Sequence, residues 1–171
     1  MKKVAKFEKI SLSQFNDCLP MFEDFNYTSI KLPSRATLGS AGYDFFLPYD
    51  IIIKPKQNIL IPTGVRCKLE AGYVLQLYPR SGLGFKYGLQ LINTVGIIDS
   101  DYYYAANEGH IMAKLVNTGD KEIYLEKGTA FMQGIFTEYF ITEDDYTEGI
   151  RVGGFGSTSR TETASFSAKG S

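Results

Sequence analysis

The stretch VRCKLEAGYVLQLYP, residues 65–79, decides the fold class. Val65, Cys67 and Leu69 alternate with charged residues. This period of two exposes one face of a strand to water and buries the other. Gly72 then offers a turn, and YVLQLY follows as a second strand-like run. The pattern predicts a β-hairpin rather than a helix.

Short apolar runs of the same kind recur along the chain, separated by Gly, Pro, Asn or Asp. They read YDFFL, DIIIK, NILIP, LQLIN, HIMAKLVN, EIYLE and FMQGIF. Many short, punctuated strands are typical of a sandwich or barrel. The one helical candidate is residues 11–25, where apolar residues follow a helical spacing but Pro20 would strain the middle, so the choice stays open. We predict an all-β fold with at most one or two short helices.

Composition excludes several function classes. The 171 residues fit a single domain. They include 18 basic and 19 acidic residues, a formal net charge of −1 at pH 7, and form no basic run, which argues against a nucleic-acid binder. No apolar stretch has membrane-spanning length and no signal pattern opens the chain. Cys18 and Cys67 stand far apart outside any CxxC, so we expect reduced thiols, no zinc and a cytoplasmic location.

The familiar catalytic motifs are absent from the sequence. His110 is the only histidine, and we expect it to be structural or on the surface, which removes a histidine base from consideration. A Walker lysine and a dinucleotide-binding glycine motif after a strand are missing too. Yet residues 151–160, RVGGFGSTSR, combine glycines and hydroxyls with arginine and could wrap anionic oxygens, without the helix that normally follows such a loop.

Five segments resemble the five motifs of the trimeric deoxyuridine triphosphatase (dUTPase) family, bacterial or phage type, over about residues 30–159. They are AGYDF (41–45), PRSGLG (79–84), NTVGIIDSDY (93–102), EKGTAFMQ (126–133) and RVGGFGSTS (151–159). The resemblance implies a jelly-roll-like distorted barrel with a mobile C-terminal arm. It also implies a homotrimer with active sites shared between subunits, and Mg²⁺-dependent hydrolysis of dUTP to dUMP and pyrophosphate. That reaction limits uracil incorporation into DNA and supplies dUMP for thymidylate synthesis.

The resemblance assigns a role to each motif. Arg80, Ser81 and Gly82 would grip the polyphosphate, because a tight bend can aim a guanidinium, a hydroxyl and an amide at one point. Asp99 closes the apolar run VGIID, and it would orient and deprotonate the water that attacks the α-phosphorus. Asp101, two residues on, is expected only to cap a turn.

Nucleoside selection would use the segment around Asp99. Asn93 offers a donor and an acceptor to the uracil edge, and the Tyr102 ring would lie against deoxyribose and leave no room for a 2′-hydroxyl. The remaining expected substrate contacts are Ile97, Ile98, Met112 and Gln133. Asp44 would hold Mg²⁺ through water or would pair with Arg80, and both readings stay open.

The last motif would cross to a site formed by other subunits. Arg151 would pair with the γ-phosphate, Phe155 would lie over the uracil, and Gly156, Ser157 and Thr158 would cap the phosphates. Arg151 stands four residues before Phe155 where five is common, and Ser159 replaces a frequent glycine. We expect four regions: an extension packed on the domain (1–30), the β domain (31–150), the arm (151–160) and a disordered tail (161–171).

Five residues, Tyr103–Asn107, expand the family's usual spacing after Tyr102. They predict a packed loop at a subunit interface or over the base, and the sequence leaves the choice open. Two other functions also stay open. One is a dCTP deaminase of similar fold, and the other is a nucleotide-responsive regulatory protein with a protein partner, for which the expanded loop is the obvious contact.

Overall fold

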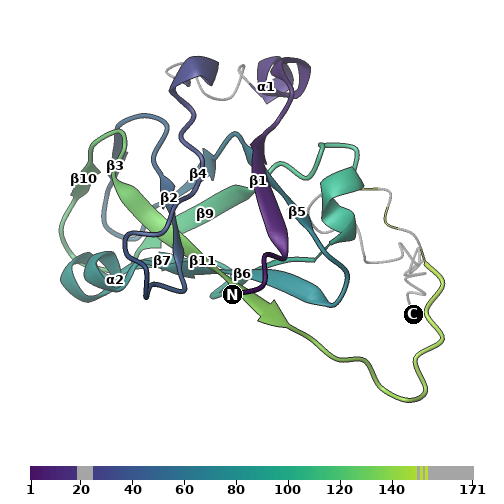
Figure 1. The fold of residues 1–171 in the computed structure, drawn as a ribbon. Helices are drawn as coiled ribbons and strands as arrows, with labels where there is room; N and C mark the ends of the chain where they lie inside the picture. Colours follow the sequence, from purple (N-terminus) through teal and green to yellow (C-terminus); the bar gives the residue numbers. More distant parts are fainter. Residues whose placement is uncertain (19–24, 150, 152, 154–171) are drawn as a thin grey trace, which may run out of the picture.

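The structure is a computed structural model that describes residues 1–18, 25–149, 151 and 153. Figure 1 shows the order of its elements. They are β1 (Ala5–Lys9), α1 (Leu12–Cys18), η2 (Tyr27–Ser29), β2 (Tyr43–Phe46), β3 (Ile51–Ile53), β4 (Asn58–Pro62), β5 (Val65–Leu69), β6 (Tyr73–Pro79), α2 (Ser81–Tyr87), β7 (Leu89–Leu91), β8 (Gly96–Ile98), η3 (Asp101–Tyr104), β9 (Met112–Asn117), β10 (Ile123–Leu125) and β11 (Ala130–Glu138). In this part of the chain, no helix has the length and apolarity needed to span a membrane.

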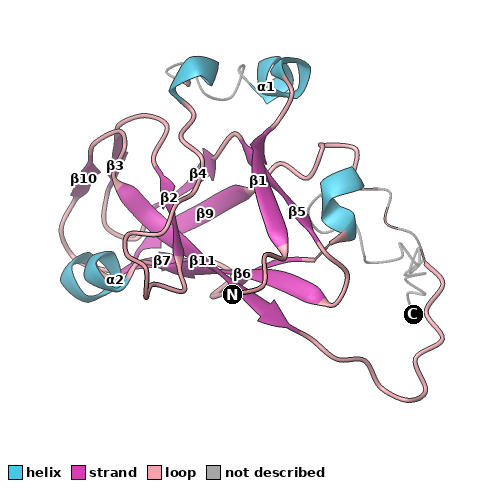
Figure 2. Cartoon of the chain, in the orientation of Figure 1, coloured by secondary structure: helices cyan, strands magenta, loops and turns pink. Residues whose placement is uncertain are grey.

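The strands form antiparallel sheets around one apolar core. Strands β2, β11, β6 and β8 make the largest sheet in that order, and β4, β9 and β7 make a second. The pairs β1–β5 and β10–β3 lie toward opposite sides of the molecule in Figure 2. Phe45, Ile61, Leu75, Leu115 and Phe131 are fully buried between the sheets. The predicted all-β fold with at most two short helices is confirmed.

The predicted β5–β6 hairpin is wrong, although the turn exists. The N–H of Tyr73 donates to the carbonyl of Glu70 at 3.3 Å, so the chain does bend there. Beyond the bend β5 pairs with β1, whereas β6 pairs with β11 and β8. A local turn signal specifies a change of direction, but it does not specify that the two strands share one ladder.

The N-terminal extension shares the core of the domain. Strand β1 pairs with β5 from Ala5↔Leu69 to Lys9↔Val65, and Figure 1 shows the two side by side. Helix α1 ends at Cys18, before Pro20. Its Phe15 packs edge-on against Phe25 with ring centroids 4.7 Å apart. Burying one such aromatic side chain contributes roughly 1.5–3 kcal/mol.

Candidate functional site

Asp44, Gln133 and Arg80 meet on three adjacent strands. In the ladder, Gln133 of β11 pairs with Asp44 of β2 on one side and with Tyr78 of β6 on the other. Arg80 follows directly after β6, and its Nη1 donates to Asp44 Oδ2 at 2.8 Å. The Arg80 side chain is 41% exposed and that of Asp44 is 15% exposed. Asp44 therefore orients a guanidinium that still presents donors to solvent.

The segment after Arg80 is a helical turn, not the tight bend expected from the sequence. Helix α2 starts at Ser81, and Arg80 occupies the N-cap position without a side-chain cap. Amides in the first turn of a helix have no intrahelical acceptor. Gly82 borders open space, because a Cβ built there would meet no atom within 4 Å. Ser81, Gly82 and Arg80 can thus approach one anionic group together, and we call these three residues the phosphate clamp.

A cavity of about 310 Å³ brings together Asn93 and Met112, two of the expected nucleoside contacts. Its lining is otherwise mostly apolar and comprises Leu60, Leu77, Leu91, Ile92, Gly96, Ala113 and Lys114. An apolar cleft with few polar groups is the usual form of a small-ligand pocket. Sequence reasoning missed Lys114, although its alternation with Met112 on β9 places both on one face of the strand.

Asp99 lies at the surface and contacts the arm of its own chain. Its side chain is 54% exposed, and its Oδ2 accepts from Arg151 Nη2 at 2.7 Å. Arg151 Nε donates to Asp101 Oδ1 at 3.0 Å, and the guanidinium lies 5.5 Å from the centre of the Tyr102 ring. Asp101 therefore pairs with the arm and does not serve merely as a turn cap.

Within one chain the structure does not bring Asp99 to the phosphate clamp. Ile98, the residue before Asp99, pairs with Leu75 near the start of β6, whereas Arg80 follows the end of that strand. Leu75 and Arg80 are five residue steps apart, a distance of about 17 Å at roughly 3.3 Å per residue. The two halves of the expected site thus lie at opposite ends of β6.

The other expected contacts of this segment differ in accessibility. Ile97 is 49% exposed, whereas Ile98 is 1% exposed and packs in the core, so only the backbone of Ile98 could reach a ligand. Tyr102 is 2% exposed, and its burial raises the pKa of the phenol. The predictions for Phe155, Gly156, Ser157 and Thr158 fall outside the described residues.

His110 is structural. It is fully buried, and its Nε2 accepts from the N–H of Gly64 at 2.9 Å. That bond leaves the proton of the neutral ring on Nδ1, which lies 3.6 Å from Cys18 Sγ. Burial lowers the pKa of His110 to about 4. Cys18 and Cys67 are both free and buried.

Asp44 is the carboxylate of this region that suits a divalent cation. In the described part of the chain, the structure has no group of three His, Cys, Asp or Glu residues able to cage a metal. Mg²⁺ commonly uses one or two carboxylates, substrate phosphates and water. Asp44 lies beside the phosphate clamp, so it could bind Mg²⁺ together with substrate phosphates and water.

Comparisons with known proteins agree with the five motifs. Residues 28–159 match the sequence model of the dUTPase family. The deoxyuridine 5'-triphosphate nucleotidohydrolase of Lactococcus lactis subsp. lactis is 41% identical over 137 residues, which cover 78% of this chain and 91% of the relative. The crystal structure of a Streptococcus mutans dUTPase is 37% identical with a TM-score of 0.65, covering 80% of this chain and 98% of that one.

A more distant structure shares the fold. It is a dUTPase variant from phage phi11 of S. aureus, described with a structural Mg(II) ion. It is 17% identical with a TM-score of 0.63, and the match covers 86% of this chain and 98% of that one.

Proposed function

The chain belongs to the dUTPase family and hydrolyses dUTP, and we propose that it does so at sites built between the subunits of a homotrimer. The observation that carries this proposal is the separation along β6. Arg80 lies about 17 Å along β6 from Leu75, the partner of the residue before Asp99, so Arg80 and Asp99 are too far apart to act on adjacent phosphates of one nucleotide. A second copy of the chain can supply Asp99 to the phosphate clamp of the first, and closed cyclic symmetry repeats the arrangement in every subunit.

The phosphate clamp binds the polyphosphate in this proposal. The guanidinium of Arg80 is aimed by Asp44 at 2.8 Å, so little conformational freedom is lost when it binds an anion. Gln133, on the strand between them, donates to Pro79 O at 3.4 Å and can turn its amide toward a phosphate oxygen or the attacking water.

The base and sugar bind in the cavity of Asn93 and Met112. The Asn93 amide pairs with the uracil edge, and the apolar walls surround the flat ring. Cytosine would leave buried polar groups unpaired, which costs about 1–3 kcal/mol each. Tyr102 is 2% exposed, with the Arg151 guanidinium over its ring, so it sets the position of deoxyribose only after Arg151 has moved to the γ-phosphate.

Asp99 activates the water. As the water oxygen bonds to the α-phosphorus, its proton passes to the Asp99 carboxylate and the bond from the α-phosphorus to the bridging oxygen breaks. The products are dUMP and pyrophosphate. Arg151 now occupies Asp99 Oδ2, so binding of nucleotide transfers this guanidinium to the γ-phosphate and frees the carboxylate.

Asp44 would hold Mg²⁺ through water, together with the substrate phosphates. When bound, the ion neutralises charge on the polyphosphate and on the leaving pyrophosphate. Asp44 then orients both the hydrated ion and Arg80, which unites the two roles that the sequence left open. We further propose that residues 31–150 form the β domain, that residues 1–30 extend it and that residues 151–160 act as the arm.

Pyrophosphate release tests this assignment. With Mg²⁺ the chain should act on dUTP and far more slowly on dTTP, dCTP and UTP. Asp99→Asn should reduce turnover by about 10²- to 10⁴-fold, the usual contribution of a positioned general base, while dUTP still binds. Release of ammonia from dCTP would instead support a deaminase, and undiminished turnover by Asp99→Asn would refute the catalytic role.

A further inference from the structure

The hydroxyl of Tyr102 is held from two sides. It donates to the backbone carbonyl of His110 at 2.7 Å and accepts from Asn107 Nδ2 at 2.8 Å. Asn107 Oδ1 accepts from the N–H of Gly109 at 3.3 Å, which orients the amide so that its NH₂ group faces the phenol. The His110 carbonyl and the Asn107 side chain therefore both restrain the hydroxyl end of the Tyr102 ring.

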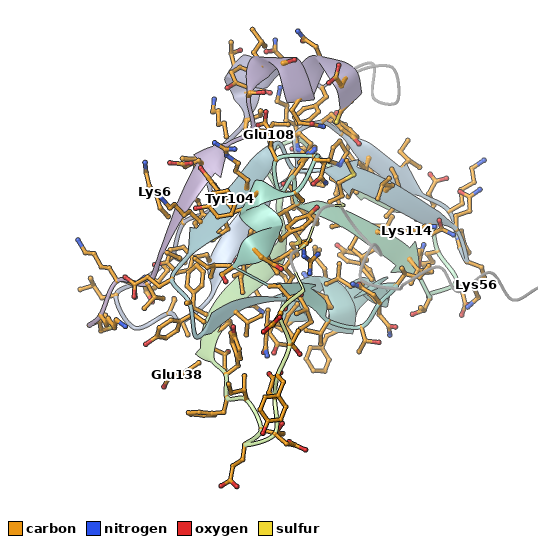
Figure 3. The ribbon with its side chains drawn as sticks, turned by 90° about the vertical axis from the view of Figure 1, so that its right-hand side faces the viewer. Lys6, Lys56, Tyr104, Glu108, Lys114 and Glu138 are labelled. Atoms are coloured by element: carbon orange, nitrogen blue, oxygen red, sulfur yellow. The ribbon has the colours of Figure 1, made fainter. Side chains whose placement is uncertain are left out.

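Asn107 is the last of the five residues that expand the motif, and the N-terminal extension holds the turn beside it. Glu108 accepts from the backbone N–H of Ser11 at 2.8 Å and from its hydroxyl at 2.6 Å. Glu108 has a φ of 56°, a left-handed conformation that residues other than glycine rarely adopt. Figure 3 shows Glu108 directly below α1. The two bonds from Ser11 support this unusual backbone.

Further contacts tie the expanded loop to the extension. Tyr103 Oη donates to Glu8 on β1 at 2.6 Å. Arg66 on β5 lies 3.6 Å from both Glu8 and Glu108, and its guanidinium lies 4.4 Å from the centre of the Tyr103 ring. We call Glu8, Ser11, Arg66, Tyr103 and Glu108 the N-terminal clasp.

The turn at Gly109, directly after the expanded loop, packs against the backbone of Tyr102 and Tyr103. A Cβ built at Gly109 would lie 2.7 Å from both the carbonyl oxygen of Tyr102 and the Cα of Tyr103. Gly109 also has a φ of 69°, so the turn and η3 are in tight contact. Because packed segments transmit displacement, movement of this turn shifts Tyr102.

We propose that Asn107 is a positioning residue for Tyr102 and that the N-terminal clasp keeps Asn107 in place. This rests on the proposed function, in which Tyr102 lies against deoxyribose. When the hydroxyl of Tyr102 is held in place, the space between its ring and the sugar stays constant. If the ring can tilt, that space widens and a ribose 2′-hydroxyl fits. The extension thus contributes to sugar selection, although residues 1–27 precede the region matched by the family model.

Asn107→Ala in the full chain tests the proposal through substrate selectivity. KM for dUTP should rise about three- to tenfold, the range expected from one lost hydrogen bond, with kcat changed by less than about twofold. The ratio of kcat/KM for dUTP over UTP should fall about three- to tenfold. Asn107→Asp keeps the size of the side chain and the acceptor for Gly109 but removes the donor, so it should lower selectivity in the same direction. Ser11→Ala should do so by about twofold.

Asn26→Ala is the matched control. Asn26 also lies in the extension, where its side chain accepts from the N–H of Thr28 at 2.9 Å and from the Thr28 hydroxyl at 2.8 Å. This variant should lower Tm and leave KM, kcat and selectivity unchanged. A drop in selectivity with Asn26→Ala equal to that of Asn107→Ala would show a general effect of stability and overturn the proposal.

The two proposals fail in different ways. Wild-type selectivity in folded Asn107→Ala and Asn107→Asp chains overturns the positioning role, even if Asp99→Asn is inactive. Full turnover by Asp99→Asn overturns the catalytic assignment, while a loss of selectivity in the Asn107 variants would still support positioning.

Discussion

Arg151 Nη2 lies 2.7 Å from Asp99 Oδ2 within one chain. A cation from the last motif thus neutralises the carboxylate proposed to accept the proton from water. The Asp99 side chain is about half exposed, whereas that of Arg151 is only 11% exposed; because water reaches the carboxylate, we expect the pair to contribute no more than about 1 kcal/mol to stability. The pair can therefore exchange for a phosphate without a large cost to the fold.

Arg151→Ala should reduce kcat/KM for dUTP about 10- to 100-fold, because a hydrogen bond to a charged group contributes about 1.5–3 kcal/mol. Tm should barely change. Asp101→Asn, which removes only the charge of the second partner of Arg151, should alter kcat/KM by less than about threefold. An unchanged kcat/KM for Arg151→Ala would mean that this arginine forms a surface ion pair and has no role with substrate.

Mixing two inactive variants should restore activity if sites are shared. Arg80→Ala lacks the clamp and Asp99→Asn lacks the base, so each alone should be nearly inactive. Random reassembly from equal amounts should give about a quarter of the sites an intact Arg80 from one chain and an intact Asp99 from another, if the assembly is cyclic. Pyrophosphate release after joint refolding measures this. Activity no greater than the sum of the separate variants would contradict shared sites.

Asp44→Asn should raise the Mg²⁺ concentration needed for half-maximal pyrophosphate release. It removes the carboxylate that aims Arg80 at 2.8 Å, so KM for dUTP should also rise, by about tenfold for a charge-assisted bond. Asp50→Asn is the control, because Asp50 accepts from Lys127 N and Tyr124 Oη and is exposed. A rise in KM with unchanged Mg²⁺ dependence would restrict Asp44 to pairing with Arg80.

His110 makes stability fall on acidification. Its pKa is lowered to about 4 in the folded chain, against a value near 6.5 when unfolded. Between those values the unfolded chain binds a proton that the folded chain excludes. The free energy of unfolding should therefore drop by about 2 kcal/mol from pH 7 to pH 5 through this residue.

Denaturant unfolding at the two pH values checks this dependence. His110→Gln removes the titrating ring and keeps a side-chain acceptor that can reach the N–H of Gly64. The variant should be less stable at pH 7, because its packing changes, and should lose less stability at pH 5 than the wild type. An equal loss in both proteins would assign the pH dependence to other groups.

The strands were predictable because their signal is local. A period of two in VRCKL and similar runs reports which side chains face the core, whatever strand lies alongside. Strand β1 was missed in the sequence, because only its pairing with β5 distinguishes Ala5–Lys9 from a polar terminus. PRSGLG carries two glycines that weaken any helical signal, so the sequence predicts a bend where the structure has helix α2.

The site was predictable only as a set of motifs. Five segments in order identified the family and the reaction, and they identified which side chains to examine. Whether Asp44 meets Arg80 depends on β11 lying between β2 and β6, a pairing between residues 36 positions apart in sequence. The sequence also could not predict that Asn107 and Ser11 support Tyr102, because this support depends on side-chain contacts between the N-terminal extension and the expanded loop.

Side-chain alternation and motif order are encoded residue by residue, so the sequence alone determined most of the strand content and the family, and it named the side chains proposed to react. Ladder partners depend on which distant strands bury each other's apolar faces. Only the tertiary structure therefore decided that β5 and β6 pair with different strands, and that Arg80 and Asp99 lie at opposite ends of β6. The distance along that strand is the reason we propose that a single subunit holds two half-sites and not one whole site.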